Sequence, residues 1–368
     1  MPTASARSLD QFPALLARLP SRLDLEALAR ETWAFRRSRG VRSGTDLLRL
    51  ALAWGPGGYS LQRVAAWAGE RGIASLTEDA LIQRLHRSVG YLQAVVGQLL
   101  TSTKPGPCWH GRVLRVSDSS SLSGPGSQGT DWRLHGVYDL GQGGFSHLAL
   151  TDSRGGEALD RGQPVAGEIR LGDRGYANAQ AWQRFLQDSE GQADFIVRMR
   201  WNTVCLQDQA GRRFDIVAWL QACPGESETH EITVWARSGK HQRPIKLRLI
   251  ARRKPAEVVA AEHKRLRQQA SRKQTRLDPR SLIAAEYLVL ATSLPEADFP
   301  AAEVLGVYRL RWQIELAFKR LKSLLHIGKL RTKTEHGTRC WLYAHLIVAL
   351  LGDDLSQDVL ESFPSGVV

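Results

Sequence analysis

The chain has 368 residues, which is enough for one large domain with insertions or for two to three smaller units. Fifty Lys and Arg against 37 Asp and Glu give a net charge of +13, which favours nucleic acid as the partner over an anionic membrane surface. The spacing of the four cysteines excludes a zinc or disulfide framework, and the lack of a signal peptide or long apolar run predicts a soluble, cytoplasmic protein that does not enter a membrane.

The positive charge is concentrated in two segments. Residues 246–280 contain twelve Lys and Arg against three Asp and Glu, and residues 309–333 contain eight against one. Runs of this kind are often solvated helix faces. Two of them in a chain of high net charge indicate a polyanionic partner instead.

Residues 1–105 have a helical pattern. Ser43 or Thr45 is expected to cap the helix of one apolar segment, and Ser60 that of the next. The sequence Ser75-Leu-Thr-Glu78 has the pattern of a capping box before a third helix. Short helices of this kind suit a small DNA-binding bundle, although a plain helical bundle fits equally well.

The pattern changes to strands after residue 111. The first predicted strand, 113–116, ends at Asp118, and a later one, 169–171, ends at Asp173. A helix capped by Asn178 follows. Further strands are predicted at 134–140, 145–151 and 195–199. Three strands followed by alternating strand and helix predict a mixed α/β sheet.

The rest of the chain has a β-rich, basic segment followed by helices. A hairpin at 231–250, a basic helix at 257–273 and a strand at 287–291 form the expected insertion. A long helix from residue 300 to about 325 and a last helix at 341–351 follow it. We therefore expect the following units: a helical, DNA-binding region at 1–105, a first core segment at 106–200, the insertion at 201–294, a second core segment at 295–355, and an irregular tail at 356–368.

The helix predicted over residues 307–325 separates polar from apolar side chains. At 100° per residue, one narrow face carries a single carboxylate and three groups that bind phosphate well, and the opposite side is an apolar stripe. The polar face consists of Tyr308, Arg311, Glu315 and Lys322, bordered by Trp312 and Lys319. Taken alone, this pattern also fits a solvated face with an ordinary ion pair between Arg311 and Glu315.

Two further carboxylates lie at the ends of predicted strands. Asp118 and Asp173 each end a predicted strand, where an aspartate is usually a turn or cap residue. If the two strands are neighbours, both carboxylates lie at one sheet edge, and a helix packed on the sheet can bring Glu315 there. Three carboxylates are the hard oxygen ligands that Mg²⁺ or Mn²⁺ prefers, and two such ions suit phosphodiester chemistry.

These residues resemble a known family. The pattern Tyr308-x₂-Arg311-x₃-Glu315-x₆-Lys322 matches the signature of the bacterial insertion-sequence-four transposases, the YREK group of the DDE transposases. The segments around Asp118 and around Asp173-Arg-Gly-Tyr176 are similar to those that carry the family's two aspartates. The second gap, 142 residues, matches the family's β-rich insertion, and the resemblance covers roughly residues 40–352.

The resemblance implies an RNase H-like catalytic core that moves an insertion element by cutting and pasting double-stranded DNA. The metal ion, Mg²⁺ or Mn²⁺, would be held by Asp118, Asp173 and Glu315. The partners would be the terminal inverted repeats, the target DNA and a second copy of the chain. Tyr308, Arg311 and Lys322 match residues that hold phosphates.

One further position matches a relative by spacing alone. Tyr287 aligns with an aromatic side chain that stacks a flipped base, although a buried strand aromatic is the simpler interpretation.

Two other hypotheses share these features. An RNase H-like nuclease would use the same carboxylates without paired DNA ends. A non-catalytic or truncated DNA-binding derivative would tolerate loss of the carboxylates, and the presence of all three in this chain argues against it.

Overall fold

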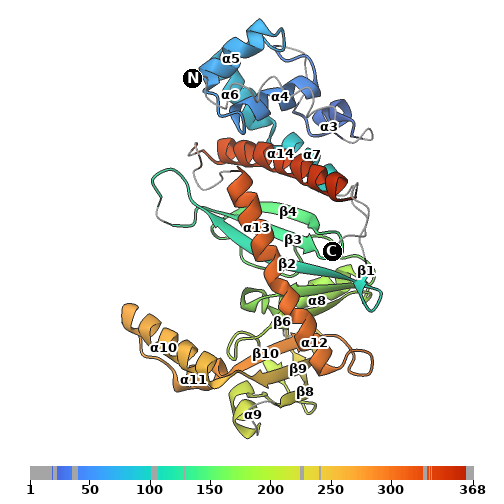
Figure 1. Ribbon diagram of the computed structural model, residues 1–368, viewed down its shortest axis with the longest axis vertical. Helices are drawn as coiled ribbons and strands as arrows, with labels where there is room; N and C mark the ends of the chain where they lie inside the picture. The colour runs from blue at the N-terminus through green and yellow to red at the C-terminus, as the bar shows by residue number, and fades with distance from the viewer. Residues whose placement is uncertain are drawn as a thin grey trace.

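The computed structural model describes residues 19, 23–34, 40–100, 107–127, 129–223, 228–239, 242–325, 330, 332 and 334–361. The molecule is elongated, with helices at one end, a large sheet in the middle and further strands and helices at the other end (Figure 1). None of the helices in these segments is long and apolar enough to cross a membrane.

The N-terminal helices form a bundle that packs on the last helix. They are α3 (Leu25–Glu31), α4 (Gly44–Trp54), α5 (Leu61–Glu70), α6 (Glu78–Arg87) and α7 (Val89–Leu100). Their buried leucines and valines join one core with α14 (Glu335–Glu361), which lies across the end of the bundle (Figure 1).

In the N-terminal bundle, the predicted caps are confirmed at two of three helices. Ser43 and Ser60 accept hydrogen bonds from the backbone N–H groups of the first turns of α4 and α5. The capping-box prediction was wrong, because Thr77, not Ser75, caps α6 and accepts from the N–H of Ala80 at 3.3 Å. Thr77 directly precedes the acidic first turn, which is where a capping hydroxyl can reach the free N–H groups.

The last helix is longer than its apolar core indicated. It begins six residues before the predicted start at 341 and continues through Glu361, so residues 356–361 are helical where an irregular tail was expected. The remaining tail, 362–368, and residues 1–18 lie outside the described residues.

A ten-stranded mixed sheet runs through the middle of the molecule. Its order is β4-β3-β2-β5-β6-β10-β9-β8-β7, and β1 pairs with β2. The pairs β2–β5 and β5–β6 are parallel, and the other pairs are antiparallel. The strands are β1 (Pro107–Trp109), β2 (Arg112–Leu122), β3 (Trp132–Asp139), β4 (Gly144–Asp152), β5 (Glu168–Gly172), β6 (Asp194–Arg198), β7 (Leu206–Gln207), β8 (Thr229–Ala236), β9 (Ile245–Arg253) and β10 (Tyr287–Thr292).

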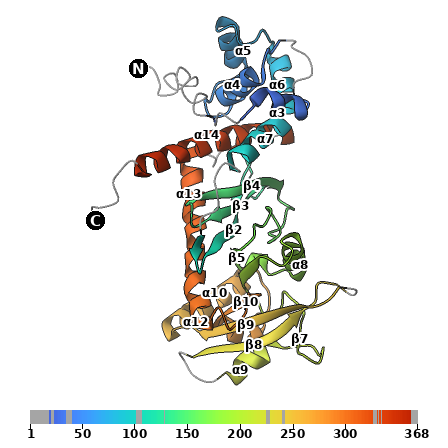
Figure 2. The same cartoon turned by 90° about the vertical axis from the view of Figure 1, so that its right-hand side faces the viewer.

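Helices cover both faces of this sheet (Figure 2). One face carries α8 (Ala179–Asp188), which Asn178 caps as predicted. The other carries a helical segment made of α12 (Ala301–Tyr308), the short 3-10 helix η3 (Arg309–Arg311) and α13 (Trp312–Leu325). The predicted mixed α/β sheet is therefore confirmed.

The basic segment between β6 and α12 extends the same sheet. Strand β10 pairs with β6 on one side and with β9 on the other, so the hairpin of β8 and β9 continues the core sheet. Around it lie α9 (Ile216–Ala222), α10 (Ala256–Arg272) and α11 (Pro279–Ala285). Helix α10 projects from the body and buries none of its residues, as expected for a basic, solvated helix (Figure 1).

Candidate catalytic site

Asp118 and Asp173 lie side by side because their strands pair in parallel. Ser117 of β2 is the register partner of Gly172 of β5, and the two aspartates are the next residues on each strand. Asp118 does not end its strand as predicted, since β2 continues to Leu122 along β3. The chain leaves the sheet only at Asp173, whose side chain caps the 3-10 helix η2 (Arg174–Tyr176). One carboxylate therefore lies inside a strand and the other at a strand end.

Each aspartate uses one oxygen for a local hydrogen bond. Oδ1 of Asp118 accepts from the N–H of Ser119 at 2.8 Å, and Oδ1 of Asp173 accepts from the N–H of Gly175 at 2.7 Å. Within the described part of the chain, no hydrogen bond reaches the second oxygen of either group. Two neighbouring carboxylates are thus held in place, each with an oxygen left for a ligand.

Burial and charge disfavour the ionised form of Asp118. Burial raises its pKa from 3.8 to about 6, the N–H of Ser119 opposes this shift, and the nearby charge of Asp173 adds to it. A buried carboxylate beside a second one gains from a bound cation, which offsets both the burial and the repulsion. The pair therefore fits a divalent metal ion with oxygen ligands.

Helix α13 crosses the sheet over β2 and β3 (Figure 1). Gly136 of β3, the register partner of Asp118, allows this close approach: a Cβ there would lie 2.8 Å from the Phe318 ring. Ile314, Phe318 and Leu321 are buried beneath the helix, as the apolar stripe predicted. At the far end, Nζ of Lys322 donates to the carbonyl of Ser121 in β2 at 3.0 Å.

Glu315 lies on the outer side of this helix and is engaged by a cation. Its side chain is 56% exposed, and its Oε1 accepts from Nη2 of Arg311 at 2.5 Å. Arg311 also acts on Asp118 and lowers its pKa, which connects Glu315 to the aspartate pair through one guanidinium. In the segments that the structure describes, no three His, Cys, Asp or Glu side chains are arranged to hold a metal ion as they stand. The expected cluster of Asp118, Asp173 and Glu315 is therefore not preassembled.

Tyr308 occupies a different position from the other signature residues. It is 7% exposed, and its hydroxyl donates to the carbonyl of Gly172 at 3.2 Å, directly before Asp173. Burial raises the pKa of Tyr308 to about 12. The short helix η3 interrupts the predicted continuous helix directly after Tyr308. Tyr308 therefore packs beneath the site, while Arg311 and Glu315 lie on the outer face of the helical segment. Trp312, 51% exposed, and Lys319 border the outer face as expected.

Glu157 lies at the site although it was not among the residues predicted from the sequence. This residue follows β4 in the loop to β5, and its Oε1 accepts from Oγ of Ser119 at 2.7 Å and from Nη1 of Arg133 at 3.1 Å. Its charge raises the pKa of Asp118. A lone glutamate in a loop gives no periodic signal. Only the packing of this loop on β2 shows its proximity.

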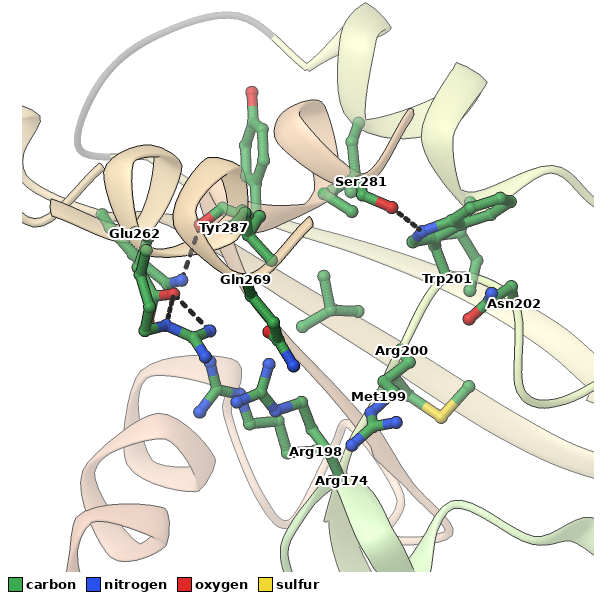
Figure 3. Close-up of a pocket in the computed structure, with 18 residues that line it drawn as sticks. Arg174, Arg198, Met199, Arg200, Trp201, Asn202, Glu262, Gln269, Ser281 and Tyr287 are labelled. Carbon is green, nitrogen blue, oxygen red and sulfur yellow. Dashed lines mark hydrogen bonds and ion pairs between the residues drawn. The ribbon is translucent and has the colours of Figure 1, made fainter. Parts of the chain in front are cut away.

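A basic cavity beside Asp173 was also not predicted from the sequence. A cavity of about 320 Å³ lies where the core meets the extended sheet, and Figure 3 shows its lining side chains. Its cations are Arg174, Arg198, Arg200, Lys254 and Arg265, with Glu262 as the acidic member. The charge run at 246–280 had indicated Lys254 and Arg265. Arg198 and Arg200 gave a weaker signal, two arginines at alternate positions where β6 ends.

The cations of this cavity lie close enough to lower one another's pKa values. Burial, together with repulsion from Arg198, lowers the pKa of Lys254 to about 8. Among the described residues, Arg174, Arg198 and Arg200 form no ion pair. Such a cavity gains from a bound anion. Tyr287, which is 7% exposed, lies in its wall as a strand aromatic, so the structure agrees with the simpler interpretation of that residue.

Comparison with known proteins identifies the family. The family model described as "Transposase DDE domain" matches residues 109–351. The chain is 39% identical over 360 residues to the protein InsL of insertion sequence element IS186A from Escherichia coli K12, which covers 97% of this chain and 96% of the relative.

Two other relatives carry the name transposase outright. The transposase for insertion sequence element IS421 of Escherichia coli is 39% identical, with 97% of this chain and 96% of the relative covered. The transposase for element IS231F of Bacillus thuringiensis subsp. israelensis is 26% identical, with 89% and 76% covered. Members of this family generally use divalent metal ions, and the mixed sheet contains their RNase H-like core. The chain therefore belongs to the DDE transposase family and is an enzyme that acts on DNA.

Proposed function

We propose that Asp118, Asp173 and Glu315 are the catalytic carboxylates of this transposase, and that the chain belongs to the insertion-sequence-four, YREK group. The observation that carries this proposal is the parallel pairing of β2 with β5, which sets two aspartates side by side beneath α13. Glu315 joins them through Arg311, which bonds to Glu315 and acts on Asp118.

The proposed metal ion is Mg²⁺ or Mn²⁺, held by the free oxygens of Asp118 and Asp173 and by Glu315. When bound, such ions activate the attacking oxygen and stabilise the leaving oxygen of a phosphodiester. The protein's own contribution is to hold the aspartates rigidly through the N–H groups of Ser119 and Gly175 and to keep Glu315 on a packed helix. When a DNA phosphate binds the guanidinium of Arg311, Glu315 would be released and would complete the set of metal ligands.

The DNA would follow the outer face of α13. Arg311, Lys322, Lys319 and the exposed Trp312 supply cations and one aromatic surface along this face. Arginine and lysine on such a face neutralise phosphates and set the position of the strand. The basic cavity beside Asp173 extends the same charge beyond the catalytic pair.

The proposed reaction is cut-and-paste transposition. Hydrolysis at the element's end frees a 3′-OH, which attacks the opposite strand to form a DNA hairpin. The hairpin is then reopened, and the 3′-OH attacks the target. Such a reaction needs both terminal inverted repeats and the target DNA, and we propose that two copies of the chain hold the two ends.

The direct test uses purified protein, Mg²⁺ and DNA that carries the element's own ends. Hairpins and strand-transfer products are expected from the wild type and not from Asp118→Asn or Asp173→Asn. Nicking without hairpins or strand transfer would favour an RNase H-like nuclease. Specific end binding without any cleavage would favour a non-catalytic DNA-binding derivative.

A further inference from the structure

Glu157 lies against the catalytic pair although it belongs to neither sheet nor helix. One of its oxygens, Oε1, is fixed by Oγ of Ser119 at 2.7 Å and by Nη1 of Arg133 at 3.1 Å. Ser119 directly follows Asp118, and Arg133 comes from β3, the strand next to Asp118. The carboxylate is therefore anchored to the strand that carries the first aspartate.

The other oxygen of Glu157, Oε2, lies near the second aspartate, at the turn where the N–H of Gly175 bonds to Oδ1 of Asp173. A Cβ built on Gly175 would lie 1.6 Å from Oε2 of Glu157 and 3.1 Å from Oδ1 of Asp173, so these oxygens are within about 5 Å of one another. Two oxygens that share one small divalent ion are separated by about 3–4 Å. No hydrogen bond from the described residues reaches Oε2 of Glu157.

Gly175 is what makes this approach possible. Any side chain at this position would collide with the Glu157 carboxylate, which is the nearest group to it. Packing therefore explains why a glycine stands at position 175: without a Cβ, it leaves the space that Oε2 of Glu157 occupies. The loop of Glu157 and the turn after Asp173 are fitted to each other at this point.

We propose that Glu157 is a fourth carboxylate of the catalytic centre and a ligand of the metal ion that Asp118 and Asp173 hold. This rests on the proposed function. Arg133 and Ser119 bind one oxygen and set its direction, and the other oxygen faces the ion. Glu157 lies beside the aspartates, but among the described residues it does not yet form a metal-binding group with them, and Glu315 is still paired with Arg311. The competing interpretation is a loop glutamate that serves only as the ion-pair partner of Arg133.

The test measures Mn²⁺ binding to the full chain by calorimetry, without DNA. Glu157→Gln keeps the shape and the bond to Ser119 but removes the charge, and it should weaken Mn²⁺ binding by about 10-fold or more. Cleavage of the element's ends should fall at limiting metal and recover in part at high metal, with end binding unchanged. The matched control is Glu303→Gln, a carboxylate on α12 that pairs with His110 and should bind Mn²⁺ like the wild type.

A second variant keeps the charge and moves it. Gly175→Ala forces Oε2 of Glu157 away and should also weaken Mn²⁺ binding, which covers the case in which Glu157→Gln does not fold. Wild-type Mn²⁺ affinity in whichever of these variants folds would overturn the proposal for Glu157. Wild-type Mn²⁺ affinity in Asp118→Asn and Asp173→Asn would instead overturn the proposed catalytic site.

Discussion

At the scale of single residues, the site has a stability cost that its function explains. Asp118 is mostly buried, lies beside Asp173 and, among the residues that the structure describes, receives one hydrogen bond from the backbone. A core residue chosen for stability alone would not be a carboxylate at this place. The cost persists until a cation binds, which is typical of active sites where function opposes stability.

Asp118→Asn should stabilise the metal-free protein at neutral pH. The folded pKa of about 6 lies above the ordinary value, so the protonated form favours folding, and the metal-free wild type loses stability as pH rises from about 4 to about 6. Above this window the asparagine variant should unfold with about 1–3 kcal/mol more free energy than the wild type, and the difference should vanish near pH 4. Urea unfolding at several pH values measures this. The exposed Asp298→Asn is the control, and an equal gain there would remove the argument from burial.

At the scale of elements, local patterns were predictable and contacts between elements were not. The strand ending at Asp173 and the apolar stripe of α13 follow from periodicity, and so do the candidates Asp118, Asp173 and Glu315. Glu157 could not be found, because its loop has no periodic pattern and reaches β2 only through tertiary packing. The 3-10 turn at Arg309–Arg311 was also not predicted; it directly follows Tyr308, whose hydroxyl bonds to β5, a tertiary contact without a local sequence pattern.

Tyr308→Phe tests whether that anchoring positions the second aspartate. Loss of the hydroxyl frees the Gly172 carbonyl at the end of β5, where one hydrogen bond contributes about 0.5–1.5 kcal/mol. Cleavage should slow by about 2–10-fold, while binding to the element's ends stays as in the wild type. Gel-shift and single-turnover cleavage assays separate the two effects. Weaker end binding with unchanged cleavage would mean that Tyr308 contacts phosphate, as the family resemblance implied.

The two kinds of residue on α13 should respond differently to substitution. Glu315→Gln removes the charge of a metal ligand and keeps the shape, so cleavage and strand transfer should disappear while end binding stays intact or improves slightly. Arg311→Ala and Lys322→Ala remove cations that face phosphate, so end binding or hairpin formation should weaken while initial nicking partly survives. Cleavage by Glu315→Gln at the wild-type rate would show that Glu315 is only the ion-pair partner of Arg311.

At the scale of the whole molecule, one sheet unites the catalytic core with the basic segment. The sequence predicts a β-rich insertion at residues 201–294, and in the structure its strand β10 pairs with β6 and carries β9 and β8 onto the core sheet. Non-local pairing of this kind has no local sequence signal. As a consequence, one continuous sheet connects the aspartates with the basic cavity, whose lining includes Arg174, the residue after Asp173.

DNA binding should depend steeply on salt, and the basic cavity should account for part of that dependence. A protein that neutralises phosphates releases counterions, so the logarithm of affinity falls linearly with the logarithm of salt concentration, by about 0.9 for each phosphate. Arg198 and Arg200 line the cavity and form no ion pair within the described segments, so each can neutralise one phosphate. The double variant Arg198→Ala/Arg200→Ala should therefore reduce the slope by about 2.

Arg212→Ala is the matched control, because this exposed arginine is already paired with Asp208 at 2.8 Å and should leave the slope unchanged. Fluorescence anisotropy with end DNA, from low to moderate salt, gives both slopes. A double variant with the wild-type slope would show that the DNA does not pass the cavity, and the steepness would then have to come from the outer face of α13.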